Sequence, residues 1–113
     1  MRRPSLSDVR RTTDQFLRTA LATRGIDSSE FSRLEAELAE RKRSGTLPDL
    51  VRDRKDHFHT SDGLYRIAKS RQDLWTVSKL KDSSRFARVA EAKTRHLCWV
   101  LVQRLIVLDD RPS

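Results

Sequence analysis

Apolar side chains in the first 45 residues recur every three or four positions, which is the spacing of one face of an α-helix. The first run covers 6–21, and Gly25 follows it as a helix terminator. The second run begins after Asp27, a good N-cap residue, and Gly45 follows its last turn. The pattern therefore predicts two amphipathic helices joined by a short connection.

The segment 46–58 has a weaker periodicity. Pro48 near its start favours the first turn of a helix, and apolar residues follow at positions 50, 51 and 58. We predict a third, short helix that turns basic side chains outward. Residues 5–58 would then form the helical part of the chain.

The apolar period changes toward two after Gly63. Tyr65 and Ile67 alternate with polar or small residues, a polar stretch follows at 70–73, and alternation resumes over 74–80. Aromatic and β-branched residues on both sides of a short polar tip are typical of a β-hairpin. We predict a hairpin over 64–80, with an unassigned turn type.

Two interpretations compete for the last third of the chain. A single helix over 84–108 would be apolar on two sides, and such a helix needs two partners. Alternatively, 85–90 would add a third strand to the hairpin. The length of the apolar pattern favours the helix. Its second apolar side predicts a homodimer formed through 97–108.

These elements, taken in order, predict one domain over residues 1–113 of class α+β, mostly helical. Two or three helices, a β-hairpin and a long C-terminal helix follow the order of a winged helix-turn-helix domain. Separately, the dozen residues 24–35 resemble the turn and second helix of phage-repressor-type helix-turn-helix proteins. For that stretch, a helical hairpin with a glycine C-cap is the favoured interpretation.

Positive charge is concentrated in one stretch. The chain has a formal net charge of +8, and the 64–95 stretch carries nine Lys/Arg against three Asp/Glu. A surplus of this kind favours a polyanionic partner, because Lys and Arg that neutralise phosphates release condensed counterions. The predicted nucleic-acid-binding residues are the basic side chains of the hairpin, of its flank and of the third helix: Lys69, Arg71, Lys79, Lys81, Arg85, Arg88, Arg52, Arg54 and Lys55.

The element order suggests that the protein is a small regulator or accessory factor that binds double-stranded DNA. The hairpin would grip the phosphates. The third helix would be the reader of bases, yet it also carries Asp49, Asp53 and Asp56. Base recognition therefore stays unlocated. The alternative function is a protein-interaction module or inhibitor that docks on an acidic partner protein.

Candidate chemistry is sparse. Histidine and cysteine side chains bind zinc, and the candidates here are His57, His59, His96 and Cys98. Their spacing is unlike that of zinc fingers. A ribonuclease built on His57 or His59 is a second, less favoured possibility. With three glycines in the chain, a phosphate-cradling loop is excluded. We expect no catalytic residue, no metal site, no cofactor and no enzyme.

The remaining predictions concern location and the aromatic residues. One cysteine and no apolar leader indicate a cytoplasmic protein, and the tract 97–108 is too short and interrupted to cross a bilayer. Tyr65, Trp75 and Phe86 would suit stacking on unpaired bases. Their alternation within the basic stretch favours a place in the core instead.

Overall fold

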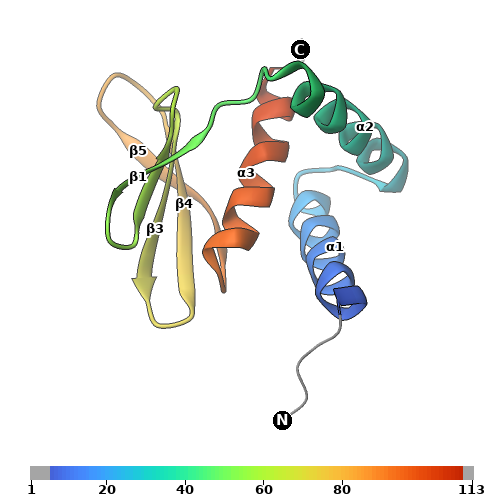
Figure 1. Cartoon of the computed structure of the whole chain (residues 1–113), viewed down its shortest axis with the longest axis horizontal. Helices are drawn as coiled ribbons and strands as arrows, with labels where there is room; N and C mark the ends of the chain where they lie inside the picture. The colour runs from blue at the N-terminus through green and yellow to red at the C-terminus, as the bar shows by residue number, and fades with distance from the viewer. Residues whose placement is uncertain (1–5, 111–113) are drawn as a thin grey trace.

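The computed structural model describes residues 6–110, with side chains described from residue 11 onward. Within that range the chain forms three helices and a five-stranded antiparallel sheet (Figure 1). The elements in chain order are α1 (Leu6–Ala22), α2 (Ser28–Ser44), β1 (Leu50–Arg54), β2 (His57–Thr60), β3 (Tyr65–Arg71), β4 (Leu74–Leu80), β5 (Phe86–Ala92) and α3 (Arg95–Asp109).

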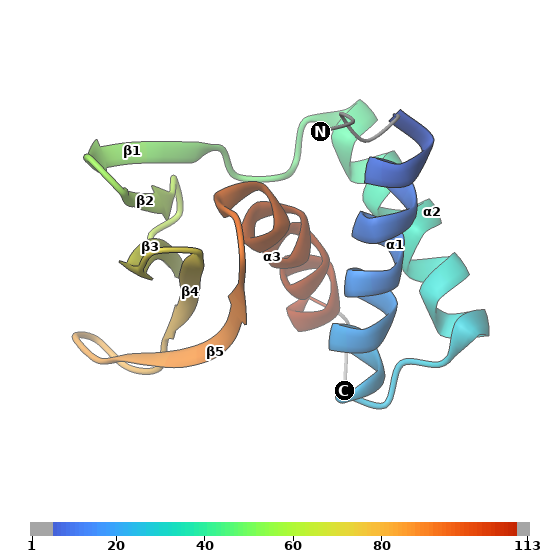
Figure 2. The same ribbon diagram turned by 90° about the horizontal axis from the view of Figure 1, so that it is seen from below.

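The sheet is a meander in which each strand pairs with the next along the chain, in the order β1-β2-β3-β4-β5. It curves around α3, and α1 and α2 cover the side of α3 away from the sheet (Figure 2). The molecule thus has three layers, with α3 in the middle. The core lies on both sides of α3, and its fully buried members include Leu34, Ile67, Val77 and Val102.

The two N-terminal helices and the central hairpin are confirmed. Asp27 caps α2, and its side chain accepts a hydrogen bond of 2.9 Å from the backbone N–H of Glu30. Gly45 ends α2 in the left-handed conformation with φ of 69°, which glycine adopts without steric cost. The hairpin appears as β3 and β4, which occupy the middle of the sheet and do not form a separate wing.

The predicted third helix is wrong. Residues 50–60 form β1 and β2, with Leu50 opposite Thr60 and Arg52 opposite Phe58. The turn between them is closed by Asp56, whose φ of 61° lies in the left-handed region that Asp tolerates better than most residues. Pairing with the edge of β3 outweighs the weak helical pattern, because a strand there buries Phe58 against Ile67.

The single helix predicted over 84–108 is also wrong in its first third. Residues 86–92 form β5, which pairs with β4 and places Ala90 opposite Val77. The helix begins only at Arg95, after Thr94 accepts a hydrogen bond from the N–H of Leu97 at 3.1 Å. Alanines favour helix locally, but an unpaired β4 edge over a buried face overrides that propensity. The winged-helix order is therefore incorrect.

The two apolar sides of α3 are both covered within one chain. Six residues of α3 are buried, some against the sheet and others against α1 and α2, namely Cys98, Leu101, Val102, Leu105, Ile106 and Val107. On the polar edge, Arg104 donates two hydrogen bonds to the carboxylate of Glu35 on α2, at 2.9 and 2.8 Å. Dimerisation through 97–108 stays a prediction. The apolar face of the helix that suggested it is covered by other elements of the same chain.

Candidate nucleic-acid interface

The turns of the sheet alternate between its two ends, and basic residues are concentrated at one of them. The β1–β2 turn, the β3–β4 turn and the β5–α3 connection all lie at this end, as the pairings of His57 with Ala68 and of Trp75 with Ala92 require (Figure 1). We call it the basic end. Its exposed cations are Arg52, Arg54, Lys55, Lys69, Arg71, Lys93 and Arg95.

Five of the nine predicted binding residues lie at the basic end. The other four do not: Lys81 and Arg85 are exposed in the β4–β5 loop at the opposite end of the sheet, and Lys79 and Arg88 are in ion pairs. Arg88 is on β5 and lies 2.8 Å from Glu91. The sheet therefore brings together basic residues that the sequence analysis placed on two different elements, the third helix and the hairpin.

A cavity of about 500 Å³ opens at the basic end, between the sheet and the start of α3. The rings of Phe58 and Trp75 form part of its wall, with centroids 6.2 Å apart and planes tilted by 48°. The Arg95 guanidinium lies 4.7 Å from the centre of the Phe58 ring. The remaining lining residues are Arg52, Asp56, Thr94 and His96. We call this space the aromatic cavity.

Cations and aromatic rings are paired across the strands at this cavity. Arg52 on β1 is opposite Phe58 on β2, and Lys69 on β3 is opposite Trp75 on β4. Residues directly opposite each other in an antiparallel sheet point to the same face. The two aromatic residues are half-buried, while Arg52 and Lys69 are exposed. The cavity is thus an apolar wall with positive charge along its rim.

The cations of the basic end lack acidic partners. Within residues 11–110, none of the seven forms an ion pair with a carboxylate. Asp53, in the same turn region, is already engaged by the Nδ1 atom of His59 at 2.6 Å. The side chains of Asp56 and Asp73 are in the two turns, and they offset only part of the positive charge. The basic end therefore carries a net positive charge.

The face of the sheet that points away from α3 carries a different set. His57, His59 and Arg66 share this face, since His59 is opposite Arg66 and His57 is two residues from His59. Arg66 stacks on the Phe86 ring at 3.8 Å, and a cavity of about 240 Å³ is bordered by His57 and Arg66. An imidazole held by a carboxylate is one component of acid–base chemistry. The expectation of no enzyme remains an untested prediction.

The four candidate zinc ligands are separated by the sheet. His57 and His59 point away from α3, whereas Cys98 is buried on α3 and His96 borders the aromatic cavity. Among the described side chains, no group of three or more metal-binding residues is close enough to hold an ion. Burial raises the pKa of the Cys98 thiol to about 11. This thiol is a core residue.

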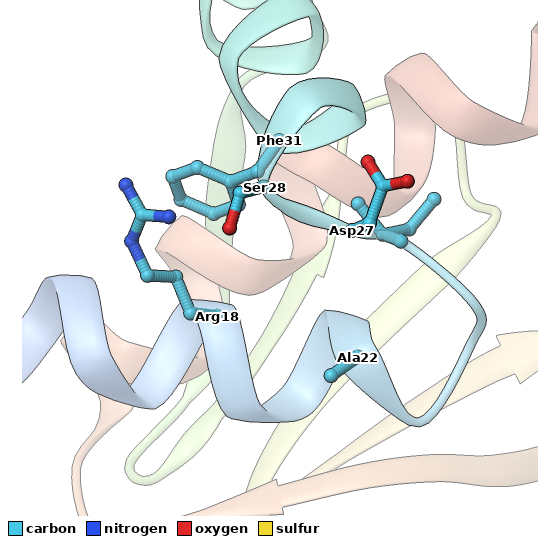
Figure 3. A pocket seen from close by; sticks show the side chains of 6 residues that line it. Arg18, Ala22, Asp27, Ser28 and Phe31 are labelled. Carbon is cyan, nitrogen blue, oxygen red and sulfur yellow. The ribbon is translucent and has the colours of Figure 1, made fainter.

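A third cavity lies between α1 and α2 and has a volume of about 320 Å³ (Figure 3). The Arg18 guanidinium points across it and lies 4.4 Å from the centre of the Phe31 ring. Arg18 is also paired with Asp14 at 2.8 Å, and Asp27 serves as the cap of α2. The charged groups here already have partners, so this cavity is a weaker candidate than the aromatic cavity.

The opposite end of the sheet lies near the C-terminal end of α3, where cations are paired, although Lys81 and Arg85 in the β4–β5 loop form no ion pair within residues 11–110. We call it the paired end. Lys79 lies 2.9 Å from Asp109, and the hydroxyl of the buried Tyr65 donates a hydrogen bond to the same carboxylate. Burial, followed by this hydrogen bond, raises the pKa of Tyr65 well above its ordinary value. Arg41 on α2 is paired with Asp110 at 2.6 Å. These cations hold structural elements together.

Sequence reasoning gave no site role to Phe58 or Arg95, and it weighed Trp75 for base stacking but favoured a place in the core. Phe58 and Trp75 both pack against the core, and each also borders the cavity. Arg95 was counted in the basic stretch without a role. The signal for Arg95 in the sequence is Thr94, an N-cap residue directly before it. That signal is recognised only when the preceding strand is known to end at Ala92.

None of the helices within residues 6–110 combines the length and apolar character needed to span a bilayer. Comparison of the chain with models of known protein families, with curated proteins and with solved structures gives no significant match.

Proposed function

We propose that this protein binds nucleic acid, with the phosphate backbone held at the basic end of the sheet. The observation that carries the proposal is the convergence of seven exposed cations, from three chain segments, none of them paired with a described carboxylate. Clustering like charges costs free energy in the free protein. A polyanion offsets that cost and also releases its own counterions.

The chemistry of the cluster favours phosphates. Arginine presents a planar fork of donors that matches phosphate oxygens, and four of the seven cations are arginines. The preference for duplex DNA rested on the winged-helix order. Because that order is incorrect, the proposal is for nucleic acid in general. No base-reading element is part of it.

The test compares two double variants that each remove two positive charges. Lys69→Ala with Arg71→Ala alters the basic end, and Lys81→Ala with Arg85→Ala alters the β4–β5 loop. Binding of the wild type and both variants to fluorescent duplex and single-stranded oligonucleotides is measured by anisotropy from low to moderate salt. We expect the first variant to lose about tenfold or more in affinity and to show a log–log salt slope shallower by about 1–2. The matched control should stay near wild type.

Absence of wild-type binding to either oligonucleotide at low salt would overturn the proposal. Equal losses in both variants would show that net charge alone, and not the basic end, accounts for binding. In the first case the acidic-partner function would become the leading one, since the same unpaired cations would steer association with an acidic protein surface.

A further inference from the structure

We propose that the aromatic cavity holds an unpaired nucleobase, so that the preferred ligand is a single-stranded segment or a duplex with an exposed base. This inference rests on the proposed function and specifies the form of nucleic acid that the basic end binds. It concerns the space between Phe58, Trp75 and the start of α3, where apolar wall and positive rim meet.

The wall of the cavity has the chemistry of a stacking site. Phe58 and Trp75 are half-buried, so their inner edges anchor in the core while part of each ring remains accessible from the cavity. Their planes are tilted by 48°, which prevents them from stacking on each other. Arg95 already lies over the Phe58 ring, so the platform for a base is the part of the Trp75 ring that borders the cavity, and every base has a π-face to offer.

The size of the cavity agrees with a small planar group. A volume of about 500 Å³ lies within the range of roughly 300–1,000 Å³ that is usual for ligand sites. A duplex would present only its backbone here, because its bases are stacked inside the helix. An unpaired base can turn out of the strand and enter. The accessible rings would then be covered on binding.

The cations lie where the phosphates of a bound nucleic-acid strand would pass. Arg52 and Arg95 border the cavity itself, and Lys69 shares the sheet face of Trp75. Arg95 is held over the Phe58 ring at 4.7 Å, which fixes its guanidinium near the opening. A base stacked on the accessible part of the Trp75 ring would place its flanking phosphates within reach of this rim. An acidic peptide would satisfy the charges but would leave the rings without a stacking partner.

The experiment compares two ligands of equal charge. One is a short oligothymidine strand, and the other is an abasic strand of the same length with the same number of phosphates. We expect the wild type to bind oligothymidine about tenfold or more tightly than the abasic strand, because stacking contributes only when a base is present. Trp75→Leu should reduce this preference to about twofold or less, and Trp99→Leu, which truncates a tryptophan that does not border the cavity, should preserve it.

A second measurement covers the case in which Trp75→Leu fails to fold. In a Trp99→Phe protein, Trp75 is the only tryptophan left of the two in the chain. Its fluorescence should be quenched by oligothymidine and unchanged by the abasic strand. Equal affinity for both strands, or no selective quenching, would overturn the inference while leaving the proposed function intact. Failure of both strands and of duplex to bind would instead overturn the proposed function.

Discussion

Basic side chains next to the two ends of α3 are in opposite circumstances. At the paired end, Lys79 and Arg41 each reach a carboxylate at the C-terminal end of α3, at 2.9 and 2.6 Å. At the basic end, Arg95 begins the same helix and Arg52 lies across the aromatic cavity from its start. Neither has an ionic partner among the described residues. A cation with a partner joins elements of the fold. A cation without one is available to a ligand.

The direction of α3 sharpens this difference. A helix favours acids near its N-terminus and bases near its C-terminus, but α3 begins with Arg95 and ends with Asp109 and Asp110. Both ends therefore carry charge of the unfavourable sign. Lys79 and Arg41 compensate the acids at one end. Arg95 at the other end forms no ion pair with a described carboxylate, and a bound anion would offset its charge.

The largest expected effect comes from reversing charge at the basic end. Arg52→Glu with Arg95→Glu should lower affinity for single-stranded nucleic acid by about 100-fold or more at low salt, because two attractions become repulsions. Stability should not fall, since a glutamate at the start of α3 gains about 0.3–1 kcal/mol from the helix dipole. Anisotropy titration and urea denaturation measure the two quantities. A variant that loses binding only because it unfolds would contradict the comparison.

An intermediate effect, on the free energy of unfolding, is expected at the paired end. Asp109→Ala removes the acceptor of the buried Tyr65 hydroxyl and the partner of Lys79, and leaving a buried donor unpaired costs about 1–3 kcal/mol. Urea denaturation measures this loss, and nucleic-acid affinity should change by less than about twofold. Asp109→Asn keeps an acceptor and should lose less. A large drop in affinity with unchanged stability would reverse the roles assigned to the two ends.

The smallest effect appears only in alkali and concerns Tyr65, the single tyrosine of the chain. Its pKa is raised in the folded protein by burial and by the Asp109 hydrogen bond, so the neutral hydroxyl is favoured by folding. Its contribution to stability is fully present below the unfolded pKa of about 10 and is lost as the pH rises above that value. Tyrosinate absorbance should therefore titrate near pH 10 in denaturant and distinctly higher in the native protein. Coincident titrations would show that Tyr65 is accessible.

The sequence predicted the local elements whose signals are complete within a few turns. Asp27 and Gly45 mark both ends of α2 because a cap acts on its own helix, and the alternation around Trp75 marks a strand for the same local reason. It failed at 50–60 and 86–92. There the residues alternate imperfectly and include good helix formers, and only pairing with a neighbouring strand decides the outcome.

The predicted binding residues divide in the same way. Composition identified the excess of positive charge and most of the side chains that form the basic end. It did not distinguish Lys69, which is exposed without an ionic partner, from Lys79, which is ten residues later and paired with Asp109. That distinction depends on which strand end lies beside which end of α3, and no local pattern contains it.

By itself, then, the sequence determined the first two helices, the central hairpin and the excess of positive charge. The tertiary structure decided that the hairpin lies inside a five-stranded sheet, that α3 is covered on both sides within one chain, and that two of the unpaired cations, Arg52 and Arg95, border an aromatic cavity. The physical reason is range. Caps and alternation act over a few residues, whereas strand pairing and charge compensation join residues far apart in the chain.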